Sequence, residues 1–167
     1  MGAYVQKIRA TVRVLLAGDE PVDGVMCLAP YSHSHDGPQT LLELLNSGDR
    51  LIPLEGFDDE SVHLLARSEI VWAAPHAGVE ARLQRPVAQA PSEERVRIRL
   101  SDGTTVEGML QLERIGQLNR ASDFLNLSAD FFAVETDDGL LFVNKLCIRD
   151  VRLFAVAPMP IVETDAG

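Results

Sequence analysis

The sequence predicts a mainly β protein made of two tandem small five-stranded β-barrels, each with a short helical insertion after its second strand. Three observations support this fold class. Residues 12–28 repeat in residues 96–112, with six identities in 17 aligned positions. Apolar and charged residues alternate in the best-preserved segments, as in half-buried strands, and glycine-containing turns separate these segments. A chain of 167 residues has room for two such domains.

The repeat continues beyond these segments with a slowly decreasing offset, which we interpret as a tandem duplication. The further aligned segments are 43–46 with 123–126, 51–55 with 131–135, and 64–70 with 142–148. Between the copies, prolines and scattered alanines without periodicity predict a linker. The predicted organisation is a first barrel at 1–74, a Pro/Ala-containing linker at 75–94, a second barrel at 95–156 and a loose tail at 157–167.

The second copy shows the elements most clearly. Residues 95–100 alternate arginine with Val, Ile and Leu, the period of a half-buried strand. Asp102-Gly103 tolerates the positive φ angles of a tight hairpin turn. Gly108 in the next strand, 105–112, suggests a bulge or a sharp bend. One or two helical turns are expected at 120–126, and three further strands at 131–136, 140–144 and 147–154.

The negative net charge of the chain argues against sequence-independent binding to nucleic acid. The chain has 15 Lys and Arg against 25 Asp and Glu, a net charge of −10. The charge is −5 in residues 1–90 and −5 in residues 91–167, so neither half offers phosphates a basic surface. There is no apolar stretch of about 20 residues and no apolar segment typical of a secretory signal, so we expect no membrane association and a cytoplasmic location. In a cytoplasmic protein we expect Cys27 and Cys147 to be reduced residues of the core.

No motif for catalysis is present. The chain has no Gly-x-Ser-x-Gly elbow and no phosphate-binding glycine loop, so we expect no catalytic residues, no cofactor and no enzymatic activity. One loop is similar to the His-x-His-x-Asp loops of metal hydrolases, with His33, His35 and Asp36 as its potential metal ligands. A solvated loop is the favoured interpretation of this segment, because further ligands are scarce.

The second copy resembles the Sm-like fold of the Sm and Hfq-type proteins. Residues 100–110, LSDGTTVEGML, match its first motif, with Asn126 as the later asparagine, and residues 144–151, NKLCIRDV, match its second. A generic SH3-like barrel shows nearly the same pattern. The second copy is also similar to a family of uncharacterised bacterial proteins with an LSDG…DFLN…VNK pattern, to which no activity is attached.

The Sm-like resemblance implies single-stranded RNA binding, usually within a ring, through positions that correspond here to Asn126, Asn144 and Lys145. The acidic charge favours a protein partner instead. We therefore predict a non-catalytic protein-interaction or scaffold module, and its barrel edges are candidate sites for homo-oligomer formation. The expected partner-binding residues are Asn119, Arg120, Asp123, Asn126, Asn144 and Lys145. The alternatives are an Sm-like RNA binder and, less favoured, a metal-dependent hydrolase that uses the His33, His35 and Asp36 loop.

Overall fold

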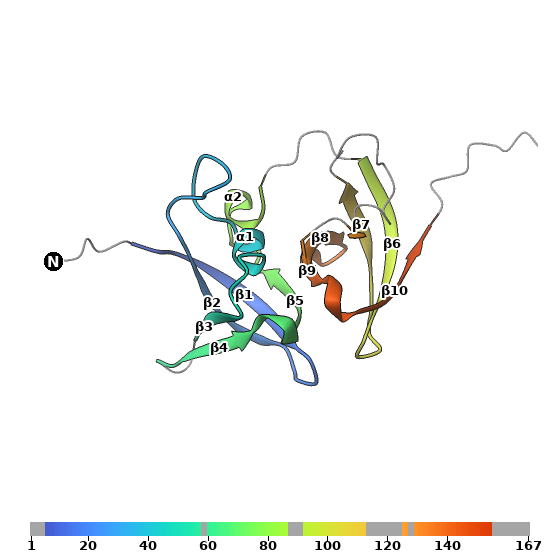
Figure 1. The fold of residues 1–167 in the computed structure, drawn as a ribbon, viewed down its shortest axis with the longest axis horizontal. Helices are drawn as coiled ribbons and strands as arrows, with labels where there is room; N and C mark the ends of the chain where they lie inside the picture. Colours follow the sequence, from blue (N-terminus) through green and yellow to red (C-terminus); the bar gives the residue numbers. More distant parts are fainter. Residues whose placement is uncertain (1–5, 58–59, 87–91, 113–124, 127–128, 155–167) are drawn as a thin grey trace, which may run out of the picture.

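Ten strands form one open antiparallel sheet, so the chain is mainly β, as predicted (Figure 1). The computed structural model describes residues 6–57, 60–86, 92–112, 125–126 and 129–154. The strands of the amino-terminal half are β1 (Ile8–Leu16), β2 (Val22–Leu28), β3 (Leu51–Gly56), β4 (Val62–Ala66) and β5 (Ile70–Pro75). Those of the carboxyl-terminal half are β6 (Ser92–Leu100), β7 (Thr105–Leu112), β8 (Phe131–Thr136), β9 (Gly139–Asn144) and β10 (Ile148–Leu153).

The strand order is the same in both halves of the sheet. It runs β10-β6-β7-β8-β9-β5-β1-β2-β3-β4, so the fifth strand of each half lies beside its first strand, followed by the second, third and fourth. The halves meet where β9, a fourth strand, pairs with β5, a fifth strand, with Trp72 opposite Val143 and Ala73 opposite Phe142. The sheet is therefore continuous through residues that the sequence assigns to two barrels, and the barrel character of each half stays a prediction.

Short helices connect some of the strands. Helix α1 (Leu41–Leu45) lies between β2 and β3, where the sequence predicts an insertion, and it begins with a capping box formed by Thr40 and Glu43. The corresponding connection of the second half lies mostly outside the described residues. Helix α2 (Ala81–Gln84) and the start of β6 occupy parts of the predicted linker. In the described part of the chain, no helix has the length and apolar character to cross a lipid bilayer.

Two hydrophobic clusters stabilise the sheet, and each contains residues from the other half. The first cluster is built from the amino-terminal half but includes Phe131 and Phe142, which are 2% and 0% exposed. The second is built from the carboxyl-terminal half but includes Leu15 and Val71. Burial of one large apolar side chain contributes about 2 kcal/mol, so this exchange ties the stability of each half to the other.

Gly108 is required by a close approach and not by a bulge. Its pairing with Val96 is regular, but a Cβ on Gly108 would collide with the carbonyl oxygen of Glu135 on β8. Gly24, its counterpart on β2, lies in the same way under Glu55 of β3, whose carbonyl oxygen would be 2.7 Å from an added Cβ. The register shifts instead occur where β1 meets β5 and where β6 meets β10.

Candidate binding cleft

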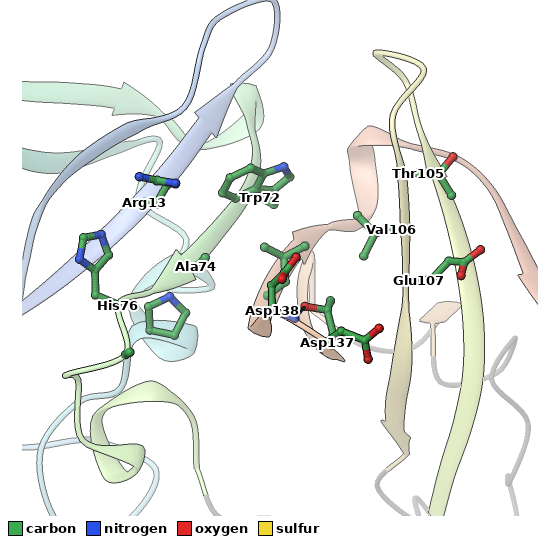
Figure 2. Close-up of a pocket in the computed structure, with 13 residues that line it drawn as sticks. Arg13, Trp72, Ala74, His76, Thr105, Val106, Glu107, Asp137 and Asp138 are labelled. Atoms are coloured by element: carbon green, nitrogen blue, oxygen red, sulfur yellow. Dashed lines mark hydrogen bonds between the residues drawn. The ribbon is translucent and has the colours of Figure 1, made fainter.

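An open cleft of about 710 Å³ lies where the two halves of the sheet meet (Figure 2). Strand β5 and the turn after it form one wall, and β7 with the β8–β9 turn forms the other. The residues that line it are Arg13, Trp72, Ala74, Pro75, His76, Ala77, Thr105, Val106, Glu107, Thr136, Asp137, Asp138 and Leu141. The cleft therefore depends on the β5–β9 junction, which brings together segments that lie far apart in the chain.

The apolar surface of the cleft is centred on Trp72, the chain's one tryptophan. Its side chain is half-buried and packs against the second hydrophobic cluster, and Val106 faces it from the opposite wall (Figure 2). A large, partly exposed indole offers apolar contact area, and its ring face attracts cations. This wall can therefore receive both an apolar side chain and the stem of a long basic one.

Arg13 and His76, which line the cleft beside β5, form a hydrogen-bonded network with Asp23. Asp23 Oδ1 accepts hydrogen bonds from Arg13 Nε at 3.0 Å and from His76 Nε2 at 2.8 Å, and Asp23 Oδ2 accepts a second bond from Arg13 at 3.1 Å. The Arg13 guanidinium, and then His76, hold the pKa of Asp23 below its usual range. The positive charge of Arg13 is thus compensated within the network.

The opposite wall carries exposed acidic groups. Asp137 and Asp138 are exposed at the β8–β9 turn, where the Thr136 hydroxyl accepts a hydrogen bond from the Asp138 amide and donates one to Gly139. Gly139 has a φ of 120°, which explains the glycine at this turn. The structure places the two carboxylates at the rim of the cleft.

No serine or cysteine is among the described residues that line the cleft, so the Asp23–His76 pair has no strong nucleophile to activate there. Within the described ranges, no group of three His, Cys, Asp or Glu side chains is arranged to hold a metal ion.

The predicted partner-binding residues lie in different environments. Asn119, Arg120 and Asp123 fall outside the described residues. Asn126 is exposed and lines, together with Lys145, a smaller groove of about 290 Å³ beside β10. Asn144 lies in the interior, only 1% exposed, where its amide nitrogen donates to the carbonyl of Ile70 at 2.9 Å.

The His33–Asp36 loop is anchored to helix α1. His35 Nδ1 lies 2.9 Å from the Asp36 carbonyl oxygen, and His35 Nε2 lies 2.5 Å from Glu43 Oε1. The Asp36 carbonyl and then Glu43 raise the pKa of His35, which favours an imidazolium that donates from both nitrogens. His33 and Asp36 are exposed. The structure thus gives His35 a role in the loop, while metal binding stays a prediction.

The sequence missed the cleft because its walls come from segments that share no motif. Asp23 and His76 are 53 positions apart, and His76 lies in the segment that the sequence predicts to be a linker. The sequence offered one sign of a binding site, a single tryptophan, Trp72, with a histidine, His76, four positions later. This pattern is too common to predict a cleft. Comparison with known proteins finds no matching family model, no matching curated protein and no matching solved structure.

Proposed function

We propose that this protein is a non-catalytic interaction module, built by duplication of a small β-barrel, that binds an extended, positively charged segment of a partner protein in the cleft between its halves. The observation that carries the proposal is the combination of a half-buried Trp72 on one wall with exposed Asp137 and Asp138 on the other. An apolar centre with a polar rim is the usual composition of a protein-binding site.

Charge complementarity supports a basic partner segment. The net charge of the chain is −10, and the charge of Arg13 in the cleft is compensated by Asp23. A Lys or Arg side chain can lay its apolar stem on Trp72 and direct its charge toward the Asp137–Asp138 turn. Long-range attraction by the acidic surface also accelerates the encounter with such a segment.

The strand order and two glycines support the duplication. Both halves have the same order of strands, and Gly24 and Gly108 occupy matched positions in their second strands. Each glycine lies under the carbonyl of a matched glutamate, Glu55 or Glu135, on the third strand. One ancestral hairpin geometry repeated twice accounts for this agreement.

A peptide array of Lys- and Arg-containing segments from the host's proteins, probed with the full chain, tests the proposal. We expect Trp72→Ala and the double variant Asp137→Asn, Asp138→Asn each to weaken binding of the positive peptides by about tenfold in titration calorimetry. The matched control, Asp19→Asn with Glu20→Gln in an exposed turn, should retain the affinity. Equal losses in the control, or no binding of any basic peptide, would contradict the cleft assignment.

Single-stranded RNA binding is a second candidate, favoured by arginines gathered on β6 and β10. The guanidinium groups of Arg95, Arg97 and Arg152 lie 5.2 to 5.4 Å from the ring centre of Phe154. Such a cluster offers both phosphate contacts and a stacking surface. Retardation of labelled oligonucleotides that weakens steeply with salt and is lost in Arg95→Gln would support this function, and absence of retardation at low salt would eliminate it.

A further inference from the structure

The β5–β9 junction is a contact between two non-equivalent edges. It joins the fifth strand of one half to the fourth strand of the other, while β10, a fifth strand, and β4, a fourth strand, form the two ends of the sheet. These ends lie on opposite sides of the molecule (Figure 1). A head-to-tail contact of this kind leaves both of its partner surfaces available at the ends, so that further copies can add in the same way.

Side chains from β8 and β9 fill a site on the first half at this junction. Phe131 and Phe142 pack with Leu45, Ile70 and Ala73 in the first hydrophobic cluster. The Asn46 side chain donates to the Phe131 carbonyl at 3.0 Å and accepts from the Phe131 amide at 2.9 Å. Arg67 donates to Asp130 at 2.9 Å. The contacts at the junction therefore include aromatic packing, an amide clamp and an ion pair.

The groove beside β10 is made of the same aligned positions on the second half. We call it the outer groove, and it is lined by Leu125, Asn126, Lys145, Ile148, Val151 and Leu153. In the repeat these residues correspond in order to Leu45, Asn46, Arg67, Ile70, Ala73 and Pro75. Four of the six lining residues are apolar. Asn126 is exposed, whereas Asn46 at the aligned position in the first half is hydrogen-bonded to the backbone of Phe131. The outer groove is thus the counterpart of the site that β8 and β9 fill.

The opposite end of the sheet carries the counterparts of the two phenylalanines. In the repeat, Leu51 corresponds to Phe131 and Leu64 to Phe142. Leu51 is 51% exposed and Leu64 is 60% exposed, and Val62 on the same strand as Leu64 is 54% exposed. We call these three side chains the β3–β4 face. Exposed, large aliphatic side chains at an unpaired sheet edge are typical of an interaction surface.

We propose that copies of this chain associate head to tail, with β4 of one copy pairing with β10 of the next and the β3–β4 face filling the outer groove. Transfer of the β5–β9 register places Leu64 opposite Val151 and Val62 opposite Leu153. Asn126 then holds the backbone of Leu51 as Asn46 holds that of Phe131. The interaction is independent of the cleft and of the function proposed for it.

Several charged residues make this contact weaker than the internal junction. Arg50 and Lys145 occupy the positions that correspond to Asp130 and Arg67, so the contact between copies lacks the ion pair of the internal junction. In the second half, Arg99 and Arg149 replace Leu15 and Val71, which are buried at the internal junction. The association is therefore reversible, and added salt strengthens it by screening the repulsion between two chains that each carry a net charge of −10.

Sedimentation of the full chain over a range of concentrations tests the proposal. The mass should rise above the 18.3 kDa of one chain as concentration increases toward about 1 mM, and at a given concentration it should rise further with salt. Leu64→Asp and Leu153→Asp, both at exposed positions, should each weaken the association at least about tenfold. Tyr31→Asp, in an exposed loop, is the matched control and should leave it unchanged. A single-chain mass at every concentration and salt would overturn the proposal.

A mixture of the two variants distinguishes a head-to-tail contact from a symmetric one. A mixture of Leu64→Asp and Leu153→Asp should form a dimer, because the first variant retains an intact outer groove and the second an intact β3–β4 face. A symmetric contact between two β4 edges would leave Leu153→Asp fully associated on its own and would give no dimer that contains both variants, and this result would overturn the proposal.

Discussion

Glu43 is the residue that joins the long loop after β2 to helix α1. Its carboxylate accepts hydrogen bonds from the hydroxyls of Ser32 and Ser34 at 2.6 and 2.8 Å, and from the Thr40 amide at 3.1 Å. Burial opposes ionisation of Glu43, but these hydrogen bonds and the one to His35 outweigh it and lower the pKa of Glu43 to about 2. A carboxylate with this many donors stabilises the folded state only while it is ionised.

The free energy of unfolding should therefore decrease as pH falls from about 4.5 toward 2, by on the order of 3 kcal/mol from this group. The pKa of His35 is raised, so protonated His35 also stabilises the folded state. This stabilisation is complete below pH 6.5 and is lost as the pH rises through the pKa of His35 in the folded protein. Urea denaturation at a series of pH values measures both effects. Glu43→Gln should flatten the profile in both ranges, whereas Glu20→Gln should not; identical profiles for Glu43→Gln and wild type would contradict this account.

At the scale of the strand, Gly108 sets how closely β7 and β8 approach. Alanine at this position forces the two backbones apart, so we expect Gly108→Ala to lower the free energy of unfolding by about 3 kcal/mol. The corresponding change on β2, Gly24→Ala, should have a similar effect. Gly78→Ala, where an added Cβ meets nothing within 4 Å, is the control and should change stability by less than about 0.5 kcal/mol in the same denaturation assay.

The strands of the second half could be predicted well because local chemistry determines them. The predicted strands 105–112 and 131–136 match β7 (Thr105–Leu112) and β8 (Phe131–Thr136). Alternation determines which residues face the core, and the glycine turn at Gly103 has the expected positive φ of 90°. Predictions of this kind need no knowledge of the partner strand.

The β5–β9 junction and the cleft could not be predicted, because no local pattern specifies which strands of different halves pair. Phe131 and Phe132 are consecutive, which indicates that both faces of β8 are buried. Phe131 and Phe142 belong to the second copy of the repeat but pack in the first cluster, which is built mainly from the amino-terminal half. Consecutive buried aromatic residues in a strand were the available sign of a second covered face.

For the whole molecule, the exchange of core residues predicts a single cooperative unfolding transition. Phe142→Ala removes an aromatic side chain from the first cluster while it lies on a strand of the second half, so both halves should lose stability together, by about 4 kcal/mol. Calorimetry should show one transition at lower temperature with equal calorimetric and van't Hoff enthalpies. Tyr31→Ala, at a position that is 80% exposed, should have little effect. Two separate transitions in either protein would contradict the coupling.

The pairing of Trp72 with Val143 also has a consequence for synthesis of the chain. When β5 leaves the ribosome, its partner β9 is still about 70 residues from completion, a delay of about 4 to 14 s at ordinary translation rates. During that interval Leu15 and Val71 have no second cluster to enter, and the edge of β5 has no neighbour. The nascent amino-terminal half therefore exposes a pairing-competent edge for seconds, and neighbouring nascent chains on one messenger compete for it with the chain's own β9.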